Sequence, residues 1–132
     1  MWSKAGAVSA TETFQRFVAA INGHDVDALT SLMTSDHLFV DSMGNRVQGA
    51  DSMQTGWRGY LAMCPDYWIR VRNLLSERET VIATGEAGGT IDGITWQTPA
   101  AWLAVFSGGQ VSEWRVFADN KPVYEIIGRR RR

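Results

Sequence analysis

Asp41 is the side chain with the clearest chemical potential in this chain. It follows the apolar triplet Leu38–Val40 and precedes a glycine–asparagine turn signal. The triplet predicts a short strand, in which alternate side chains share a face, so His37, Phe39 and Asp41 are expected to point the same way. A carboxylate leaving such a strand is either a general base or the cap of an Asx turn. The turn cap is the commoner role for an aspartate, and the residues alone do not exclude the role of general base.

His37 and Tyr60 are the other candidates for a catalytic role. His37 is about 13 Å from Asp41 along an extended strand, so the two cannot hydrogen-bond, although one ligand can reach both. A histidine at a strand start more often binds water at a cavity rim. Tyr60 lies on a predicted helix, and its hydroxyl can stabilise a developing oxyanion. No metal site or cofactor is expected, because His24, His37 and Cys64 are the only soft ligands and lack ligand spacing.

Large aromatic side chains are abundant, with six tryptophans in 132 residues. Their flat surfaces suit planar or polycyclic ligands. More than half of these residues are nevertheless expected to fill the core or to form a subunit interface. The candidates for a cavity wall are Phe17, Phe39, Trp57, Tyr60, Trp96, Trp102 and Trp114. Trp57, Tyr60 and Trp114 are the preferred ones. Glu86 is a further candidate ligand contact, because a bulge in its glycine-rich strand would turn it inward, although a solvated face is commoner.

Composition and charge indicate an ordinary globular protein of one domain, with 45% hydrophobic and 20% charged residues. Four of the 13 basic residues are Arg129–Arg132; without them nine basic residues face 14 acidic ones, which argues against nucleic-acid binding. No apolar segment is long enough for a signal peptide or a membrane span. The single cysteine, Cys64, suits a reducing cytoplasm.

Segments with helical hydrophobic periodicity come first in the chain and strand-like segments follow, an order that predicts an α+β domain. Helices are expected over 9–22, from about 24 to 33 and over 50–63, followed by strands at 66–75, 80–91, 94–107 and 111–118 and a last helical turn at 123–127. Gly85, Gly88 and Gly89 are expected to form bulges that bend the sheet around a cavity. The predicted segments are a flexible N-terminus (1–8), the domain (9–127) and a basic disordered tail (128–132).

Several strings between about residues 9 and 127 resemble the NTF2-like superfamily and, within it, the SnoaL-like (polyketide cyclase-like) proteins. They are Phe17–Asn22 with His24 and Asp25, Phe39–Gly49, Gly56 and Trp57, Pro65–Tyr67, and Gly109–Val111 with Glu113–Arg115. The resemblance implies a cone of three N-terminal helices packed on a strongly curved antiparallel sheet, with an internal pocket and a homodimer formed through the open sheet face. The superfamily includes isomerases, cyclases, epoxide hydrolases and transport factors, so it implies no single activity.

Two enzyme branches are similar in part. The resemblance to the ketosteroid isomerase branch puts Asp41 in the place of the general base, but Phe17 stands where the oxyanion tyrosine would be, and Ala101 or a neighbour stands where the protonated aspartate would be. In the limonene epoxide hydrolase branch, which uses two carboxylates and an arginine, Val116 replaces one aspartate and only Glu86 offers a second carboxylate. Neither mechanism is therefore complete in this chain.

The chain is expected to bind a small hydrophobic molecule, polycyclic or carbonyl-bearing, in a cone-shaped pocket. One hypothesis is a cofactor-independent isomerase or cyclase, with Asp41 as base and Tyr60 and His37 stabilising the oxygen. The alternatives are a non-catalytic binding module and an epoxide hydrolase-like enzyme. A base must line the cavity, whereas a turn-capping aspartate faces its own backbone amides.

Overall fold

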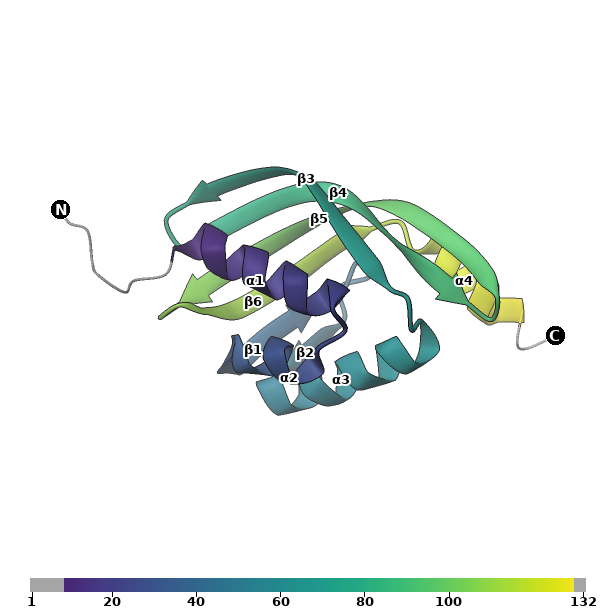
Figure 1. The fold of residues 1–132 in the computed structure, drawn as a ribbon, viewed down its shortest axis with the longest axis horizontal. Helices are drawn as coiled ribbons and strands as arrows, with labels where there is room; N and C mark the ends of the chain where they lie inside the picture. Colours follow the sequence, from purple (N-terminus) through teal and green to yellow (C-terminus); the bar gives the residue numbers. More distant parts are fainter. Residues whose placement is uncertain (1–8, 130–132) are drawn as a thin grey trace.

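The computed structural model describes residues 9–129 as four helices and one six-stranded sheet (Figure 1). The elements are α1 (Ala10–Asn22), α2 (Val26–Ser31), β1 (Met33–Val40), β2 (Arg46–Gln48), α3 (Ala50–Met63), β3 (Trp68–Glu77), β4 (Thr80–Ile91), β5 (Ile94–Ser107), β6 (Gln110–Ala118) and α4 (Lys121–Arg129). The strand order is β2-β1-β6-β5-β4-β3. The predicted α+β cone is confirmed, while the predicted flexible N-terminus and the end of the basic tail lie outside the described residues.

The sheet is antiparallel except where β1 meets β6. These two strands run parallel, a local exception within the predicted antiparallel sheet. Tight hairpins impose antiparallel pairing on β3 to β6, but the chain between β1 and β6 passes through five other elements, so no turn fixes their relative direction. Figure 1 shows the curved sheet arching over α1, with α2 and α3 below it.

Helix α1 covers the concave side of the sheet. Ser9 caps it by accepting a hydrogen bond from the backbone N–H of Glu12, as the capping box predicts. Its end is fastened to β3 by the Asn22 side chain, which donates to the carbonyl of Ile69 at 3.0 Å and accepts from its N–H at 2.8 Å. The helix and the start of β3 are thereby held in register.

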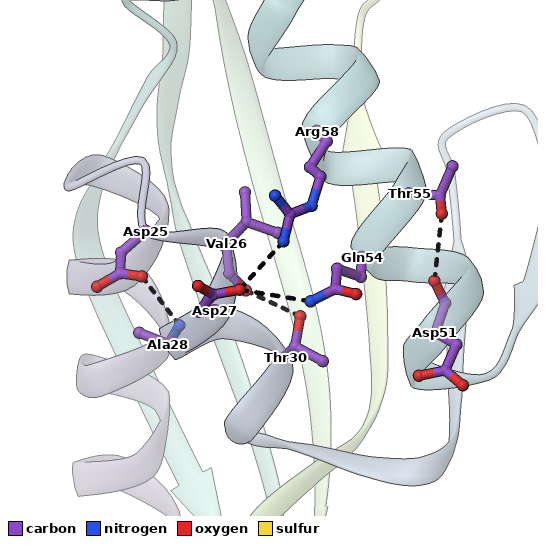
Figure 2. A network of polar contacts seen from close by, with 9 residues as sticks. All are labelled: Asp25, Val26, Asp27, Ala28, Thr30, Asp51, Gln54, Thr55 and Arg58. Atoms are coloured by element: carbon purple, nitrogen blue, oxygen red, sulfur yellow. Dashed lines mark hydrogen bonds and ion pairs between the residues drawn. The ribbon is translucent and has the colours of Figure 1, made fainter.

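Helices α2 and α3 lie against each other at the surface (Figure 2). The Asp27 carboxylate accepts from Arg58 at 3.1 Å and from Gln54 at 3.4 Å. Both charged side chains are well exposed, so this pair contributes about 0–1 kcal/mol to stability. It links α2 to α3, which carries much of the candidate site.

The glycines of β4 allow close approach between strands rather than forming bulges. The pairing of β4 with β5 is continuous, and the register shift lies in β3, between Val71 and Asn73. A Cβ on Gly85 would lie 1.7 Å from the carbonyl oxygen of Arg70, so no side chain fits there. The bulge was therefore predicted on the wrong strand. The irregularity lies in β3, and Gly85 of β4 only leaves room for it.

The C-terminal helix is longer than the predicted turn at 123–127. It begins at Lys121 and extends to Arg129, two residues past the expected end of the domain. Its residues Val123 and Ile126 form its buried face. The apolar residues Val123, Ile126 and Ile127, at spacing i, i+3 and i+4, are the signal of a full amphipathic helix. None of the described helices has the length and apolar character needed to cross a membrane.

Candidate functional site

A cavity of about 340 Å³ lies between the concave sheet face and helices α3 and α4. This is at the lower end of the range for small-molecule sites. Every layer of the fold contributes to it. The lining residues are Ile21, Phe39, Asp41, Ser42, Val47, Met53, Gly56, Trp57, Tyr60, Met63, Tyr67, Ile69, Trp102, Trp114, Val116, Asn120, Val123, Tyr124 and Ile127.

Aromatic rings make up much of the cavity wall. Of the aromatic candidates from the sequence, the structure places Phe39, Trp57, Tyr60, Trp102 and Trp114 in the lining. Phe17 and Trp96 are not part of it. Phe17 packs behind Trp114, with ring centroids 4.6 Å apart, and Trp96 stacks on Tyr67 at 6.2 Å. These two rings support the wall instead of contacting the enclosed space.

Asp41 lines the cavity and also caps a turn. Its Oδ1 accepts from the backbone N–H groups of Met43 and Asn45, both at 2.9 Å, and its Oδ2 accepts from the Asn45 side-chain amide at 3.0 Å. The turn therefore uses both acceptor positions of Oδ1 and one of Oδ2. One acceptor position on Oδ2 remains for a ligand. Asp41 thus lies where a general base would have to lie, in the cavity lining, but the hydrogen bonds that it makes are those of a turn cap.

Three tyrosine hydroxyls in the lining have no hydrogen-bond partner among the described residues. They belong to Tyr60 on α3, Tyr67 just before β3, and Tyr124 on α4. Burial raises the pKa of Tyr60 and of Tyr67 above that of a free tyrosine, and the nearby Tyr67 and Tyr124 raise that of Tyr60 further. At neutral pH the hydroxyls of Tyr60 and Tyr67 are therefore protonated, and each tyrosine hydroxyl of the lining can donate a hydrogen bond to a ligand oxygen.

A hydrogen bond closes the cavity between the β1–β2 turn and α4. The side-chain amide of Asn120 donates to Ser42 Oγ. Both residues line the cavity and also an adjoining surface depression. Ser42 keeps its hydroxyl hydrogen and Asn120 keeps its carbonyl oxygen for other partners. The polar end of the cavity is therefore the end next to Asp41.

His37 is fully buried and does not line the cavity, contrary to the expected place at its rim. The pairing of β1 with β6 shifts between Met33 and Leu38, and His37 lies in that irregular segment. Its Nδ1 donates to the carbonyl of Val111 at 2.7 Å, and its ring stacks on Phe17 at 6.3 Å. Its Nε2 has no partner within the described chain. The imidazole thus satisfies a β6 carbonyl at the irregularity, a structural role.

The buried imidazole predicts stability that falls in acid. Burial lowers the pKa of His37 below 6.5, outweighing the opposing effects of the Val111 bond, Asp36 and Glu113. The unfolded chain therefore binds a proton first, so this contribution is complete above about pH 6.5 and is lost progressively below it. We expect the urea midpoint to fall between about pH 7 and pH 5, and to fall less in His37→Asn. Equal slopes in the two proteins would contradict this.

Glu86 lies on the outer side of the sheet and not in the cavity, so its candidacy as a ligand contact fails. Its carboxylate pairs with Arg72 at 2.6 Å and with Arg70 at 3.6 Å. The lining contains Asp41 as its only carboxylate and contains no arginine. The two carboxylates and arginine of an epoxide hydrolase-like site are therefore not assembled there. No group of three or more His, Cys, Asp or Glu side chains gathers within residues 9–129.

The part of the site formed by α4 and by Asn120, the residue before it, was not predicted from the sequence. Asn120, Val123, Tyr124 and Ile127 all line the cavity. The helical spacing of the apolar residues was available as a signal, but it does not say which part of the fold the helix covers. Ala101 or a neighbour was expected in the place of the catalytic aspartate; Ala101 is not in the lining, and its neighbour Trp102 is.

Sequence comparison assigns the domain. The SnoaL-like domain family matches residues 14–114, most of the chain. The chain belongs to the SnoaL-like domain family. The resemblance seen in the sequence is thereby confirmed, and this SnoaL-like chain has an aromatic cavity on its concave side. No curated protein matches it in sequence.

Solved structures share the fold of this SnoaL-like chain. A protein of Shewanella denitrificans OS-217 assigned as a SnoaL-like polyketide cyclase aligns with TM-score 0.81 at 13% identity, covering 90% of this chain and 96% of that one. One of Jannaschia sp. CCS1, also assigned as a SnoaL-like polyketide cyclase, gives 0.79 at 22%, over 87% and 88%. A hypothetical protein of Catenulispora acidiphila DSM 44928 with a ketosteroid isomerase-like fold, in complex with trimethylamine, gives 0.74 at 21%, over 82% and 85%. At these identities the likeness concerns the fold.

Proposed function

We propose that this SnoaL-like domain binds a small, flat, mainly apolar molecule in its cavity. The observation that carries the proposal is the wall of Phe39, Trp57, Trp102 and Trp114 along a cavity of about 340 Å³. Aromatic rings of a ligand gain both burial and ring–ring contact against such a wall. A structural relative assigned as a polyketide cyclase supports a ring-containing ligand, although that assignment belongs to the relative.

The ligand is expected to carry at least one oxygen. Tyr60, Tyr67 and Tyr124 each offer an unpaired hydroxyl to the cavity. A carbonyl or ether oxygen would satisfy one or more of these donors. An entirely apolar ligand would leave the hydroxyls of Tyr60 and Tyr67 unpaired and desolvated, at about 1–3 kcal/mol each, whereas Tyr124 is 47% exposed and can bind water. This preference for an oxygenated ligand is common to a binding module and to an enzyme.

Proton-transfer catalysis is the second candidate function, favoured by one observation. Asp41 is the single carboxylate of the lining and keeps a free acceptor position on Oδ2, and Tyr60 supplies a hydroxyl donor in the same cavity. An isomerisation or cyclisation of a carbonyl compound would need this pair. Because the turn already occupies most of the Asp41 carboxylate, we rank binding without turnover first.

A thermal-shift screen with bicyclic and tricyclic aromatic ketones and quinones tests both candidates. We expect some of them to raise the melting temperature of the wild type and of Asp41→Asn, because bound ligand stabilises only the folded state. Binding without turnover predicts that the ligand is recovered unchanged by chromatography. Conversion by the wild type but not by Asp41→Asn would establish the catalytic candidate, and a screen without any stabilising compound would contradict both.

We also propose that the outer sheet face is covered by a second copy of the chain. Leu75, Ile82 and Phe117 are 77%, 48% and 54% exposed on this side, and Leu75, Ile82 and Leu103 pair in one row across β3, β4 and β5. Exposed apolar residues grouped in this way mark an interface, and a two-fold axis brings one such row against its copy.

Light scattering is expected to show a dimer for the wild type and a monomer for the double variant Ile82→Lys/Phe117→Lys, because each lysine would be desolvated in the interface. Met43→Lys is the matched control, since Met43 is 66% exposed but lies in the β1–β2 turn. A monomeric wild type would refute the proposal.

A cytoplasmic location is also proposed, because the single cysteine, Cys64, is buried and free, as suits a reducing compartment.

A further inference from the structure

The cavity lining carries negative charge only. Asp41 is the only charged side chain of the described lining, which contains no lysine, arginine or histidine. The adjoining surface depression adds Lys121 and Glu125, one charge of each sign. An anionic ligand would therefore be desolvated beside a carboxylate with no cationic partner, which is strongly unfavourable. A cationic ligand meets an anion that has an acceptor position free.

The aromatic wall acts in the same direction. The faces of Trp, Tyr and Phe rings carry negative potential, and they attract a cation placed over them. Trp57, Trp102 and Trp114 and the ring of Tyr60 all border the cavity. These rings border the same cavity as Asp41, so the aromatic wall and the carboxylate favour the same sign of charge.

The N-terminus of α4 does not offset this preference. A helix start can bind an anion through its free N–H groups. Here the N–H of Lys121 is already bonded to Asp119 Oδ1 at 3.0 Å, and Pro122 has no N–H. The N–H of Tyr124 bonds to the carbonyl of Asn120 at 2.9 Å. The backbone at Lys121, Pro122 and Tyr124 therefore offers no free N–H to a ligand anion.

We infer that Asp41 selects ligands by charge: the cavity binds an aromatic molecule that carries a protonated amine beside Asp41 Oδ2, and it rejects the corresponding carboxylate. This inference rests on the proposed binding function and narrows its ligand class. It gives Asp41 a role in specificity that requires no proton transfer.

A matched series of ligands with one ring system tests the inference. The probes are 2-naphthylmethylamine, 2-naphthalenemethanol and 2-naphthoate, titrated at neutral pH and followed by tryptophan fluorescence. In the wild type the amine is expected to bind about tenfold more tightly than the alcohol, and the carboxylate about tenfold more weakly. In Asp41→Asn the amine and the alcohol are expected to bind within about threefold of each other.

Asp119→Asn is the control, because it removes the same charge from a turn carboxylate close to the site but outside the lining. It should keep the wild-type order. If Asp41→Asn does not fold, Asp41→Ser replaces it, since a serine hydroxyl can also accept from turn amides.

The outcomes separate the inference from the function on which it rests. If the wild type binds neither the alcohol nor the amine, the proposed aromatic binding fails, and the inference fails with it. If the alcohol binds but the amine binds no more tightly, or the carboxylate binds as well as the amine, only the charge selection is overturned. An unchanged amine preference in the Asp41 variant would also overturn it.

Discussion

Phenylalanine in place of Gly56 is expected to abolish ligand binding while leaving the fold intact. Gly56 is exposed and also lines the cavity, so the cavity reaches the surface beside it. A Cβ added there would meet only the Met53 sulfur, at 3.9 Å. The new ring therefore has room to occupy the opening, and we expect ligand affinity to fall by at least about tenfold.

Gly59→Phe is the matched control for this prediction. Gly59 lies on the same helix, is exposed, and has nothing within 4 Å of an added Cβ. Both variants gain helix propensity, so neither is expected to melt below the wild type. Binding is measured by tryptophan fluorescence with an aromatic ligand from the screen. Equal affinity in the two variants would show that Gly56 does not border the ligand's route or its site.

Alanine in place of Gly85 is expected to lower the free energy of unfolding by about 3 kcal/mol. The added Cβ would lie 1.7 Å from the Arg70 carbonyl oxygen and 2.8 Å from the Arg70 carbonyl carbon. These are backbone atoms held in the β3–β4 ladder, so no flexible side chain can move aside to relieve the contact. One of the two strands must shift, and hydrogen bonds next to the bulge would be strained or lost.

Urea denaturation of Gly85→Ala and Gly59→Ala separates this steric effect from the general effect of removing a glycine. Gly59→Ala, in open helix, should raise the free energy of unfolding by about 0.5–1 kcal/mol. The two substitutions are chemically identical but are expected to have opposite signs. A stability of Gly85→Ala equal to or above the wild type would mean that the two strands approach less closely than the structure has them.

Local signals in the sequence predicted most of the elements. β4 and β5 have the predicted bounds, because the Asp92–Gly93 pair between them takes positive φ values of 52° and 75°, which that dipeptide tolerates and a tight hairpin requires. Helical spacing correctly placed Trp57 and Tyr60 on one face of α3, and both line the cavity. Each of these features depends on residues close together along the chain.

Features that depend on distant residues were not predictable in this way. The parallel pairing of β1 with β6 joins strands that are far apart along the chain, and His37 is buried beside Phe17, which belongs to α1. Glu86 points to Arg70 and Arg72 rather than to the cavity, because the bulge lies on β3 and leaves β4 regular.

By itself, the sequence implied the cone only through its resemblance to the NTF2-like proteins, whereas its own pattern determined an α+β domain rich in aromatic residues, with a carboxylate, Asp41, at the end of a strand. Periodicity and turn chemistry suffice for that, since they act over a few residues. Only the tertiary structure decided which side chains share the cavity. It joined Asp41 to Asn120 and Tyr124 from the far end of the chain, and it showed the carboxylate already bonded to its own turn. The reason is that a binding site is a property of packed surfaces, and packing brings together residues that no local pattern relates.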